Sequence, residues 1–415
     1  MLSVHPYSCC HMLWLEVAPT HLDAPIMLKA SLAATVTVFA LLASQPGVAQ
    51  TAPERTWTRA NDTRRIDFPT TAKGEAVLAV DTHTHTLFSD GVVWPTFRLW
   101  EAEQDHLAAY AVTDHLEAHP YAPDIVTDDH NRPYAIAVKE AARISSKVLP
   151  IPGVEITRGM PWGHFNALFL KDVNALAVDT TMSKDPTEVL KAARGQGAVI
   201  IWNHPWALPG LDPVAEDPMP AEQRGLLKAG LFDAVEIANS SQYSAAAFDI
   251  ALKNGLAVVG ASDVHGAIDA DIQIPEGQHR TTTLVLARDG SAESIRAAML
   301  QKRTAALYRQ TLYGREQELS EIVGGALRMT GKARVQSFLT KDMVQVELHN
   351  DAFMPFQLRL NSASPLTSAR VLTVPAHGKV VIQFANVPDI AAFALAAEVL
   401  NAFVDPRRNL MVTLR

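Results

Sequence analysis

Residues 81–91 have the sequence Asp81-Thr82-His83-Thr84-His85-Thr86-Leu87-Phe88-Ser89-Asp90-Gly91, and they stand where an apolar run, 76–82, ends. We predict this run to be a strand. Side chains two positions apart in a strand point to the same side, so His83 and His85 can face one metal ion together. Asp90 lies in the turn just after them, close enough to reach a neighbouring ion. A histidine pair alone is a weak signal, but the Ser-Asp-Gly turn at this spacing makes it more specific.

Histidines and carboxylates recur at the ends of the other predicted strands. We predict strands at 76–82, 109–113, 149–155, 164–170, 197–202, 233–238, 256–261 and 281–287. The candidate metal ligands at or beside these strand ends are His83, His85, Asp90, His115, Glu155, His164, His204, Asp263 and His265. Imidazoles and carboxylates are the usual ligands of Zn and Mn, and nine exceed what one ion takes from a protein. We therefore expect two to three divalent ions, with Mn favoured and Zn or Fe as alternatives.

A structural role is the alternative for each histidine, because a single histidine is more often a core or surface residue than a ligand. That alternative must explain why so many stand at strand ends. Four other histidines fall in predicted helices or loops, and we leave them outside the metal site. These are His106, His119, His130 and His279.

Helical patterns alternate with the strands. We predict helices at 95–106, 134–146, 185–195, 220–229, 243–254 and 291–301. This alternation indicates βα units with a parallel sheet, and the number of units favours a closed barrel over an open sheet. The fold class is therefore α/β, with a hydrolase barrel over 75–313. From about 314 the pattern changes to apolar–polar alternation, which predicts a small β-rich, sandwich-like domain over 314–415.

The first seventy-four residues are expected to lie outside the barrel. Residues 27–49 have the pattern of a signal peptide: Lys29, an apolar run, then small residues suited to cleavage. We interpret 1–26 as an over-called leader and 50–74 as a lead-in arm. The expected location is periplasmic or secreted, with no membrane attachment after cleavage. Both cysteines, Cys9 and Cys10, lie in the leader, so the mature chain would have no disulfide.

Composition excludes several classes of protein. The 415 residues are 48% hydrophobic and 19% charged, which excludes wholesale disorder. The formal net charge is -8, from 36 Lys and Arg against 44 Asp and Glu, and no basic stripe stands out. We therefore expect no nucleic-acid partner.

The motifs together resemble those of the PHP (polymerase and histidinol phosphatase) superfamily, over roughly 75–310. The family's five motifs stand in order as His83/His85, Thr113-Asp114-His115, Gly153-Val154-Glu155, His204-Pro205 and Asp263-Val264-His265. The resemblance implies a distorted seven-stranded (β/α) barrel. The export signal and the added β domain are most similar to the CehA/McbA-like branch, which includes phosphodiesterases and a carbamate hydrolase.

The resemblance also implies how the ligands are shared among three ions. His83, His85 and Asp263 would hold one ion, with Glu155 bridging to the second. His164 and His204 would complete the second. The third would be held by Asp90, His115 and His265.

Ions a few ångströms apart share a hydroxide that can attack a bound ester. We favour a phosphoester substrate, diester or monoester, because several anionic oxygens suit several ions. A carbamate or carboxylic ester is the first alternative, since Trp162, Trp202 and Trp206 would give the site apolar walls. A non-catalytic metal- or ligand-binding protein is the second.

Two further residues are candidate catalytic groups. Asp114 could orient His115 or take a proton from the nucleophile. Arg158 could neutralise a substrate oxygen, and a surface role is equally open to it. The loops 116–133, 206–222 and 266–280 leave ligand-bearing strand ends, so we expect them to form the walls of a site for a small-molecule ester. The wall residues we expect are Tyr121, Trp206, Ile274 and Arg280.

Overall fold

A computed structural model of the chain describes residues 65–125, 128–177, 181–207, 219–271, 279–335, 343–360, 370–387 and 389–415. The expected leader, the signal peptide and Ile274 lie outside the described residues, so those predictions stay predictions. Within the described residues, no helix combines the length and apolar character needed to cross a bilayer.

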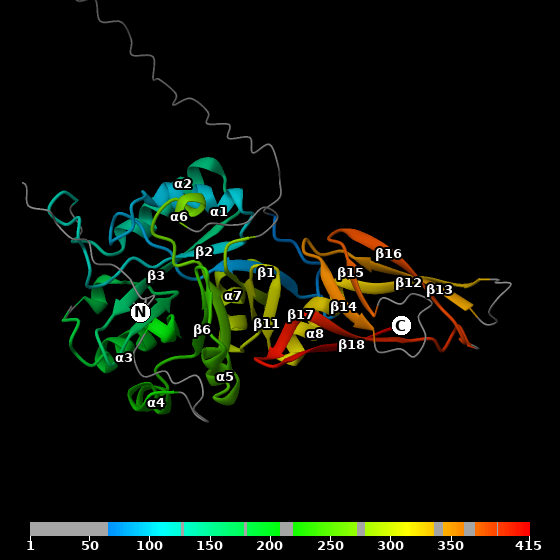
Figure 1. Cartoon of the computed structure of the whole chain (residues 1–415). Coiled ribbons are helices and arrows are strands. Elements are labelled where there is room, and N and C mark those ends of the chain that lie inside the picture. The colour runs from blue at the N-terminus through cyan, green and yellow to red at the C-terminus, as the bar shows by residue number, and fades with distance from the viewer. Residues whose placement is uncertain are drawn as a thin grey trace, which may run out of the picture. The chain divides into compact units, whose positions relative to one another are not determined.

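The N-terminal part has its strands at the centre and helices packed around them (Figure 1). Its strands are β1 (Ala76–Asp81), β2 (Ala109–Val112), β3 (Leu149–Thr157), β4 (His164–Leu168), β5 (Val199–Trp202), β6 (Ala234–Asn239), β7 (Gln242–Tyr243), β8 (Ala257–Ala261), β9 (Thr282–Ala287), β10 (Thr304–Tyr308) and β11 (Thr311–Gly314). Its helices are α1 (Pro95–Gln104), α2 (Arg132–Ile144), η1 (Asn174–Leu176), α3 (Thr187–Gly195), η2 (Pro205–Ala207), α4 (Ala221–Lys228), α5 (Ala245–Lys253), α6 (Ile268–Asp271) and α7 (Ala292–Leu300). Each predicted strand and helix is present, with ends within two residues of those expected.

The sheet is only partly parallel, which corrects the expectation of uniform βα units. β1, β2 and β3 pair in parallel, as do β5, β6 and β8. β4 is antiparallel to both β3 and β5, and β9 is antiparallel to β1. The reason at β4 is the short 158–163 connection, which makes a hairpin because a parallel crossover needs a dozen residues or more.

β8 approaches β9 through a glycine. Thr283 Oγ1 accepts a hydrogen bond from Gly260 N (3.1 Å) and donates one to Gly260 O (2.7 Å). A Cβ at Gly260 would lie 2.9 Å from the carbonyl oxygen of Thr282, so no larger residue fits without a shift. The interior between the strands is filled by small and branched side chains, including Val80, Ala111 and Val259. This packed interior is typical of a (β/α) barrel.

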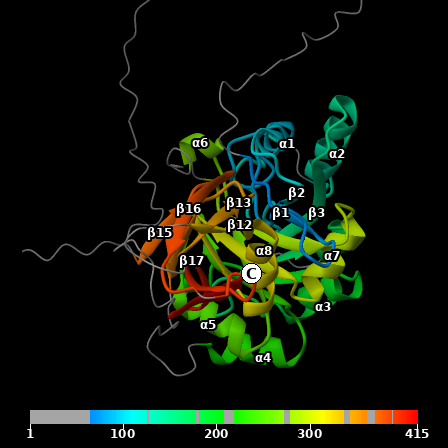
Figure 2. The ribbon, with the colours of Figure 1, turned by 90° about the vertical axis from the view of Figure 1, so that its right-hand side faces the viewer.

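The helices α1 and α2 lie side by side outside β2 in both Figure 1 and Figure 2. α1 carries Pro95 at its first position, where proline suits a helix start. Its buried face includes Leu99, Ala102 and the charged pair Arg98 and Glu101.

The C-terminal part is mostly β structure, as expected. Its strands are β12 (Leu327–Val335), β13 (Met343–Asn350), β14 (Phe356–Leu360), β15 (Val371–Val374), β16 (Gly378–Phe384), β17 (Leu395–Asp405) and β18 (Arg408–Leu414). β12, β13 and β16 form one sheet. β14, β15, β17 and β18 pair with one another, and β17 also pairs in parallel with β11, so this second sheet continues into the barrel sheet.

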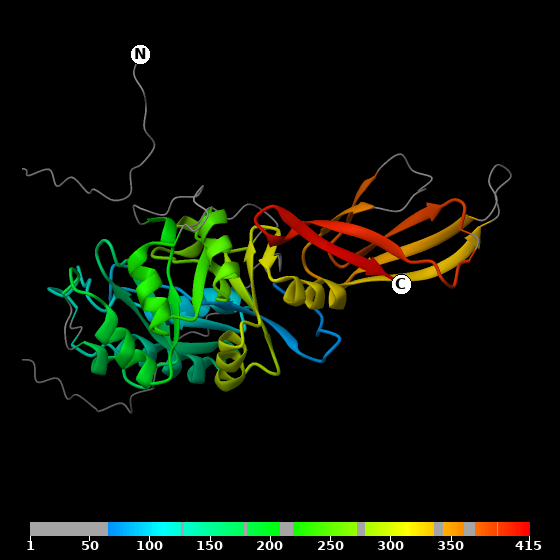
Figure 3. The ribbon, with the colours of Figure 1, turned by 90° about the horizontal axis from the view of Figure 1, so that it is seen from below.

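One helix lies in the segment expected to be all β. α8 (Glu316–Ala326) buries Leu319, Ile322, Val323 and Ala326, which follow helical spacing. Figure 3 shows this helix, in yellow, beside the red C-terminal strands. The limit of 313 between the two expected domains stays a prediction.

Candidate metal centre

Two loops that carry candidate metal ligands, one after β1 and one after β8, continue these strands side by side. Beyond β1, Thr84 forms a parallel bridge with Val264, and His85 N donates to Val264 O at 3.0 Å. Asp263 N donates to His83 O at 2.9 Å. A second bridge joins His115 to Glu155 beyond β2 and β3. These continued ladders bring ligands that are far apart in the sequence to one end of the barrel.

The first ligand group surrounds the facing nitrogens of two histidines. His83 Nε2 and His85 Nε2 are 3.0 Å apart. Asp263 Oδ1 lies 3.2 Å from the first nitrogen and 3.0 Å from the second. Glu155 Oε2 lies 3.3 and 3.4 Å from the same two atoms. All four residues expected around the first ion are therefore together.

The second group lies on the other oxygen of Glu155. Its Oε1 is 3.0 Å from His164 Nδ1 and 3.4 Å from His204 Nε2. Glu155 is 1% exposed, so its charge must be balanced inside the protein. The two oxygens of one buried carboxylate therefore face two different ligand groups.

The third group is built around Asp90. Its Oδ1 lies 3.3 Å from His265 Nε2, 3.4 Å from His115 Nε2 and 3.7 Å from His85 Nδ1. This oxygen is buried and has no hydrogen-bond partner of good geometry among the described residues. His85 therefore stands between the first and third groups.

The donor set fits divalent ions. Four overlapping sets have candidate ligand atoms within 4.8 Å of one another, and all of these atoms are imidazole nitrogens or carboxylate oxygens. The sets are His83, His85 and Glu155; His83, His204 and Asp263; Glu155, His164 and His204; and His85, Asp90, His115 and His265. A close pair of ring nitrogens such as those of His83 and His85 cannot both carry a proton without repulsion. The unpartnered oxygen of Asp90 likewise needs a positive partner. A cation among these atoms satisfies both requirements.

Hydrogen bonds at the far ring nitrogens orient the histidines. Glu236 Oε1 lies 2.9 Å from His83 Nδ1, and Thr157 Oγ1 lies 2.6 Å from His115 Nδ1. The carbonyl oxygen of Asp263 lies 2.8 Å from His265 Nδ1. Such contacts leave the Nε2 atoms to face the ligand groups, as is usual around metal sites.

The charges of the centre shift several pKa values. Burial would lower the pKa of His115, but Glu155 and Asp90 outweigh it and raise that pKa to about 11. Carboxylates likewise raise the pKa of His83, His204 and His265 against the effect of burial. Burial, together with the neighbouring His265, lowers the pKa of His85 to about 3. The carboxylates of the centre therefore favour the charged form of these imidazoles when no metal competes for them.

Asp114 lies beside the first ligand loop rather than facing the ligand groups. Its carboxylate accepts hydrogen bonds from Thr86 N (2.6 Å), Thr86 Oγ1 and Ser89 Oγ (2.8 Å). Ser89 Oγ in turn lies 3.3 Å from His85 Nδ1. Burial raises the pKa of Asp114. These contacts show a carboxylate that fixes the loop from Thr86 to Ser89; a catalytic role for it stays a prediction.

Arg158 is buried, at 3% exposed, and binds another protein carboxylate. Its guanidinium pairs with Glu117 and donates to Thr157 O at 3.0 Å. Glu117 also accepts from Thr157 N at 2.8 Å, and Thr157 is the partner of His115. These contacts indicate that Arg158 and Glu117 hold Thr157 in position. A direct contact between Arg158 and substrate stays a prediction.

Two expected wall residues are inside the protein instead. Trp202 is 0% exposed and packs with Phe165 and Phe232 in the core, because it is the last residue of β5. Arg280 is 1% exposed and pairs with Asp81 and Asp105 below the ligand loops. These residues cannot touch a substrate, so both expectations were wrong. Trp206 is partly buried, and its Nε1 donates to Gln242 Oε1 at 2.6 Å.

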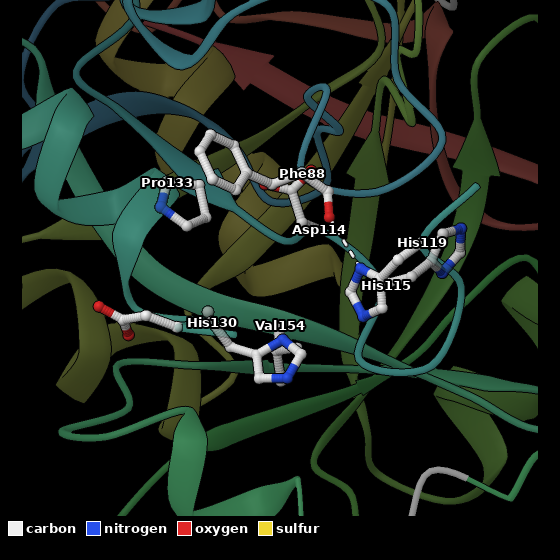
Figure 4. Close-up of a pocket in the computed structure, with 9 residues that line it drawn as sticks. Phe88, Asp114, His115, His119, His130, Pro133 and Val154 are labelled. Carbon is white, nitrogen blue, oxygen red and sulfur yellow. Dashed lines mark hydrogen bonds between the residues drawn. The ribbon is translucent and has the colours of Figure 1, made fainter. Parts of the chain in front are cut away.

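A small pocket is lined partly by residues from the segment 116–133 (Figure 4). Phe88, Pro133 and Val154 line it together with His115, His119 and His130. The two ring nitrogens of His119 face the carbonyl oxygens of Phe88 and Leu116, at 2.8 and 3.0 Å. Neither His119 nor His130 belongs to a ligand group.

Sequence reasoning missed the residues that support the ligands. Asn203 donates to Glu155 Oε1 at 3.0 Å, and Asn239 donates to Asp263 Oδ2 at 3.2 Å. Glu236 accepts from both Asn239 and the backbone N of His204. The one available signal was a charged residue in the apolar strand β6, whose sequence is AVEIAN.

Comparisons with known proteins agree with this geometry. A solved two-domain protein from Bacteroides vulgatus, described as containing a predicted PHP-like metal-dependent phosphoesterase, is 32% identical, with a TM-score of 0.75. The match covers 86% of this chain and 99% of that one. An Ig-like domain model matches residues 333–415.

A second match is weaker. A putative metal-dependent phosphoesterase from Bifidobacterium adolescentis is 18% identical, with a TM-score of 0.34 over 45% of this chain and 88% of that one, too low to support an argument. No match was found among curated proteins. The match to the Bacteroides protein spans both parts of the chain and is close enough to assign the family: the chain belongs to the PHP-like metal-dependent phosphoesterases.

Proposed function

We propose that this protein is an exported hydrolase of small phosphoesters, with phosphodiesters preferred, that works with two to three divalent ions. Mn is the favoured ion, with Zn or Fe as alternatives. The signal-peptide pattern of 27–49 supports export. The proposed partners are the ions and a small-molecule ester, with neither nucleic acid nor membrane.

The observation that carries the proposal is the position of Glu155. Its Oε2 faces His83 and His85, while its Oε1 faces His164 and His204. A carboxylate with one oxygen toward each of two ligand groups is the arrangement expected of a residue shared by two ions. Asn203 fixes this carboxylate by donating to Oε1.

Bound ions would supply Lewis-acid activation of water and neutralise the oxygens of a phosphoester. The protein's own part is to hold and orient the ligands. Glu236 orients the ring of His83, and Thr157 orients the ring of His115. Four of the candidate ligands, His83, His85, His115 and Glu155, are buried, so their positions would be fixed before substrate arrives. This reduces the cost of reorganisation during the reaction.

The proposal favours a phosphoester over a neutral carbamate. Ions held in three ligand groups would provide more positive charge than a neutral carbamate needs, and they would suit the several anionic oxygens of a phosphoester. An aryl carbamate was considered because tryptophans would give the site apolar walls. Trp202 lies in the core, so it does not form such a wall. The described residues give no separate observation in favour of carbamate hydrolysis.

The test is a substrate panel on the mature protein. The enzyme is stripped with a chelator, reloaded with Mn and assayed on bis-p-nitrophenyl phosphate, p-nitrophenyl phosphate and an aryl methylcarbamate. We expect the diester to be turned over fastest. His83→Ala should abolish turnover, while His349→Ala, a partly exposed histidine of β13, should not change it.

The other outcomes contradict the proposal in defined ways. Turnover of the carbamate alone would identify a carbamate hydrolase. Monoester turnover above diester turnover would overturn the diester preference. Full metal loading with no turnover of any of the three would favour a metal-binding protein without catalysis.

A further inference from the structure

Arg98 forms hydrogen bonds to both ligand loops, the one that follows β1 and the one that follows β8. It lies on α1 and is 1% exposed. Its Nε donates to the carbonyl oxygen of His85 at 2.8 Å. Its Nη2 donates to the carbonyl oxygens of Val264 and His265, at 3.1 and 2.8 Å. One guanidinium therefore binds the main chain of two metal ligands that are 180 positions apart in sequence.

A carboxylate one turn along the same helix completes the arrangement. Arg98 Nη1 donates to Glu101 Oε2 at 2.5 Å. Glu101 Oε1 accepts from the backbone N of Ile268 at 2.6 Å, where α6 begins. Glu101 is 3% exposed, so the pair is buried. Together, Arg98 and Glu101 hold the chain from Val264 to Ile268 against α1.

The two histidines whose main chain Arg98 binds also have closely aligned rings. His85 and His265 stack with their centroids 4.2 Å apart and an angle of 17° between planes. Both face Asp90 Oδ1, the buried oxygen without a good hydrogen bond. A shift of either backbone would move one ring relative to the other and widen the third ligand group.

We propose that Arg98 is a positioning residue for the third ligand group: it fixes the main chain of His85 and His265 so that their rings meet at Asp90. The proposal rests on the metal centre of the proposed function, but not on the identity of the substrate. A planar guanidinium suits this task because its fork can reach carbonyls of two segments at once. A lysine ammonium in the same place has no such fork, so it should restore the contacts only in part.

A purely structural role is the competing explanation, because a buried ion pair can also serve packing. Burying this charge is expensive, and replacing such a pair with apolar residues is often neutral or stabilising. Stability alone therefore gives weak reason for an arginine here. Three donated hydrogen bonds to carbonyls of the ligand loops instead link the charge to the ligands.

The test compares Arg98→Met and Arg98→Lys with a matched control, Arg296→Met. Arg296 is a partly buried helix arginine that donates to the carbonyl of Gly197, where β5 is about to start, away from the ligand loops. Metal content is measured by elemental analysis after gel filtration, and Mn affinity by chelator competition on full-length mature protein. Thermal melts of the metal-free forms give the loss of stability separately.

We expect Arg98→Met to lose one ion per chain, with affinity for that ion lower by on the order of tenfold to a hundredfold, as for other supports of metal ligands. Arg98→Lys should fall between this variant and the wild type. Arg296→Met should bind metal as the wild type does, even where its melting temperature falls.

Two results would overturn the proposal. One is wild-type ion content and affinity in Arg98→Met, with only a lower melting temperature. The other is loss of all ions in equal proportion, which would indicate general damage. If Arg98→Met does not fold, Arg98→Lys decides: wild-type affinity for every ion would refute the positioning role. Failure of the phosphoester assay would leave these metal measurements unaffected, so the two proposals fail separately.

Discussion

Glu236 holds His83 in one orientation, because its Oε1 lies 2.9 Å from Nδ1 of that ring while both side chains are fully buried. The contact leaves Nε2 of His83 toward His85 and Glu155. Glu236 also accepts from the backbone N of His204 at 2.8 Å. One carboxylate on β6 thus supports ligands of the first and second groups.

The first prediction is that Glu236→Ala weakens metal binding. Loss of the acceptor frees the His83 ring and leaves buried donors unpaired, so metal affinity should fall by on the order of tenfold to a hundredfold. Glu236→Gln, which keeps an acceptor oxygen, should lose less. Elemental analysis and chelator competition measure the effect. Glu318→Gln, a buried carboxylate paired with Arg303, is the control and should bind metal normally. Unchanged metal affinity in Glu236→Ala would contradict the role of this contact.

The second prediction is that metal loading releases protons at neutral pH. The pKa of His115 is raised to about 11 by Glu155 and Asp90, so its metal-free ring is protonated at pH 7. The pKa of His265 is raised in the same direction by Asp90 and Asp263. An ion binds only the neutral ring and must displace the proton. We expect release of about one proton per chain from His115 at pH 7, with a further contribution from His265, and metal affinity that rises with pH. Titration with Mn in weakly buffered solution with a pH indicator measures this. No release at pH 7 would mean that the ligands are already neutral.

The third prediction separates two roles for Arg158. The structure pairs it with Glu117, whose side chain is 0% exposed. Arg158→Met would leave that charge buried and unpaired, which costs about 3–5 kcal/mol of stability. KM for the best ester should change little while the melting temperature falls. A melting temperature near the wild type, together with a large rise in KM, would instead show that Arg158 binds a substrate oxygen.

The sequence alone was enough to select the candidate ligands that the structure brings close together. The composition of the strands predicted their ends to within two residues, and barrel geometry brings those ends to one face. The residues expected in each of the three groups lie close together, with Glu155 between the first and second. This success has a physical reason: metal ligands need particular side-chain types, and these stand out at the end of an apolar run.

The supporting residues could not be predicted in the same way. Arg98, Glu236 and Asn203 act through contacts with segments distant in sequence, and helix or strand periodicity carries no signal of such contacts. Arg280 shows the opposite error. A charged residue near a loop end was expected in the wall, but two buried carboxylates, Asp81 and Asp105, hold it inside. α8 was missed because the surrounding alternation favoured strands.

The last prediction concerns the link between the barrel and the Ig-like domain. β17 continues the barrel sheet by pairing with β11, with Leu312 opposite Ala402 and Tyr313 opposite Phe403. Tyr313 stacks on Phe403 on one side, at 5.4 Å between centroids, and on Tyr243 on the other, at 4.4 Å. One hydrophobic cluster contains side chains of both parts, so the two share a core.

Removal of 333–415 should therefore expose an apolar edge of the barrel and give an insoluble or unfolded protein, although every metal ligand remains. Phe403→Ala is the milder variant. It should cost about 2 kcal/mol in the full chain, below the range for a fully buried phenylalanine because this one is only partly buried. Thermal melts and metal content of both variants measure the effect, with Met411→Ala on the exposed face of β18 as the control. If the truncated chain is soluble, melts at the wild-type temperature and keeps its ions, the Ig-like domain contributes nothing to the stability of the barrel, and the shared core has no energetic role.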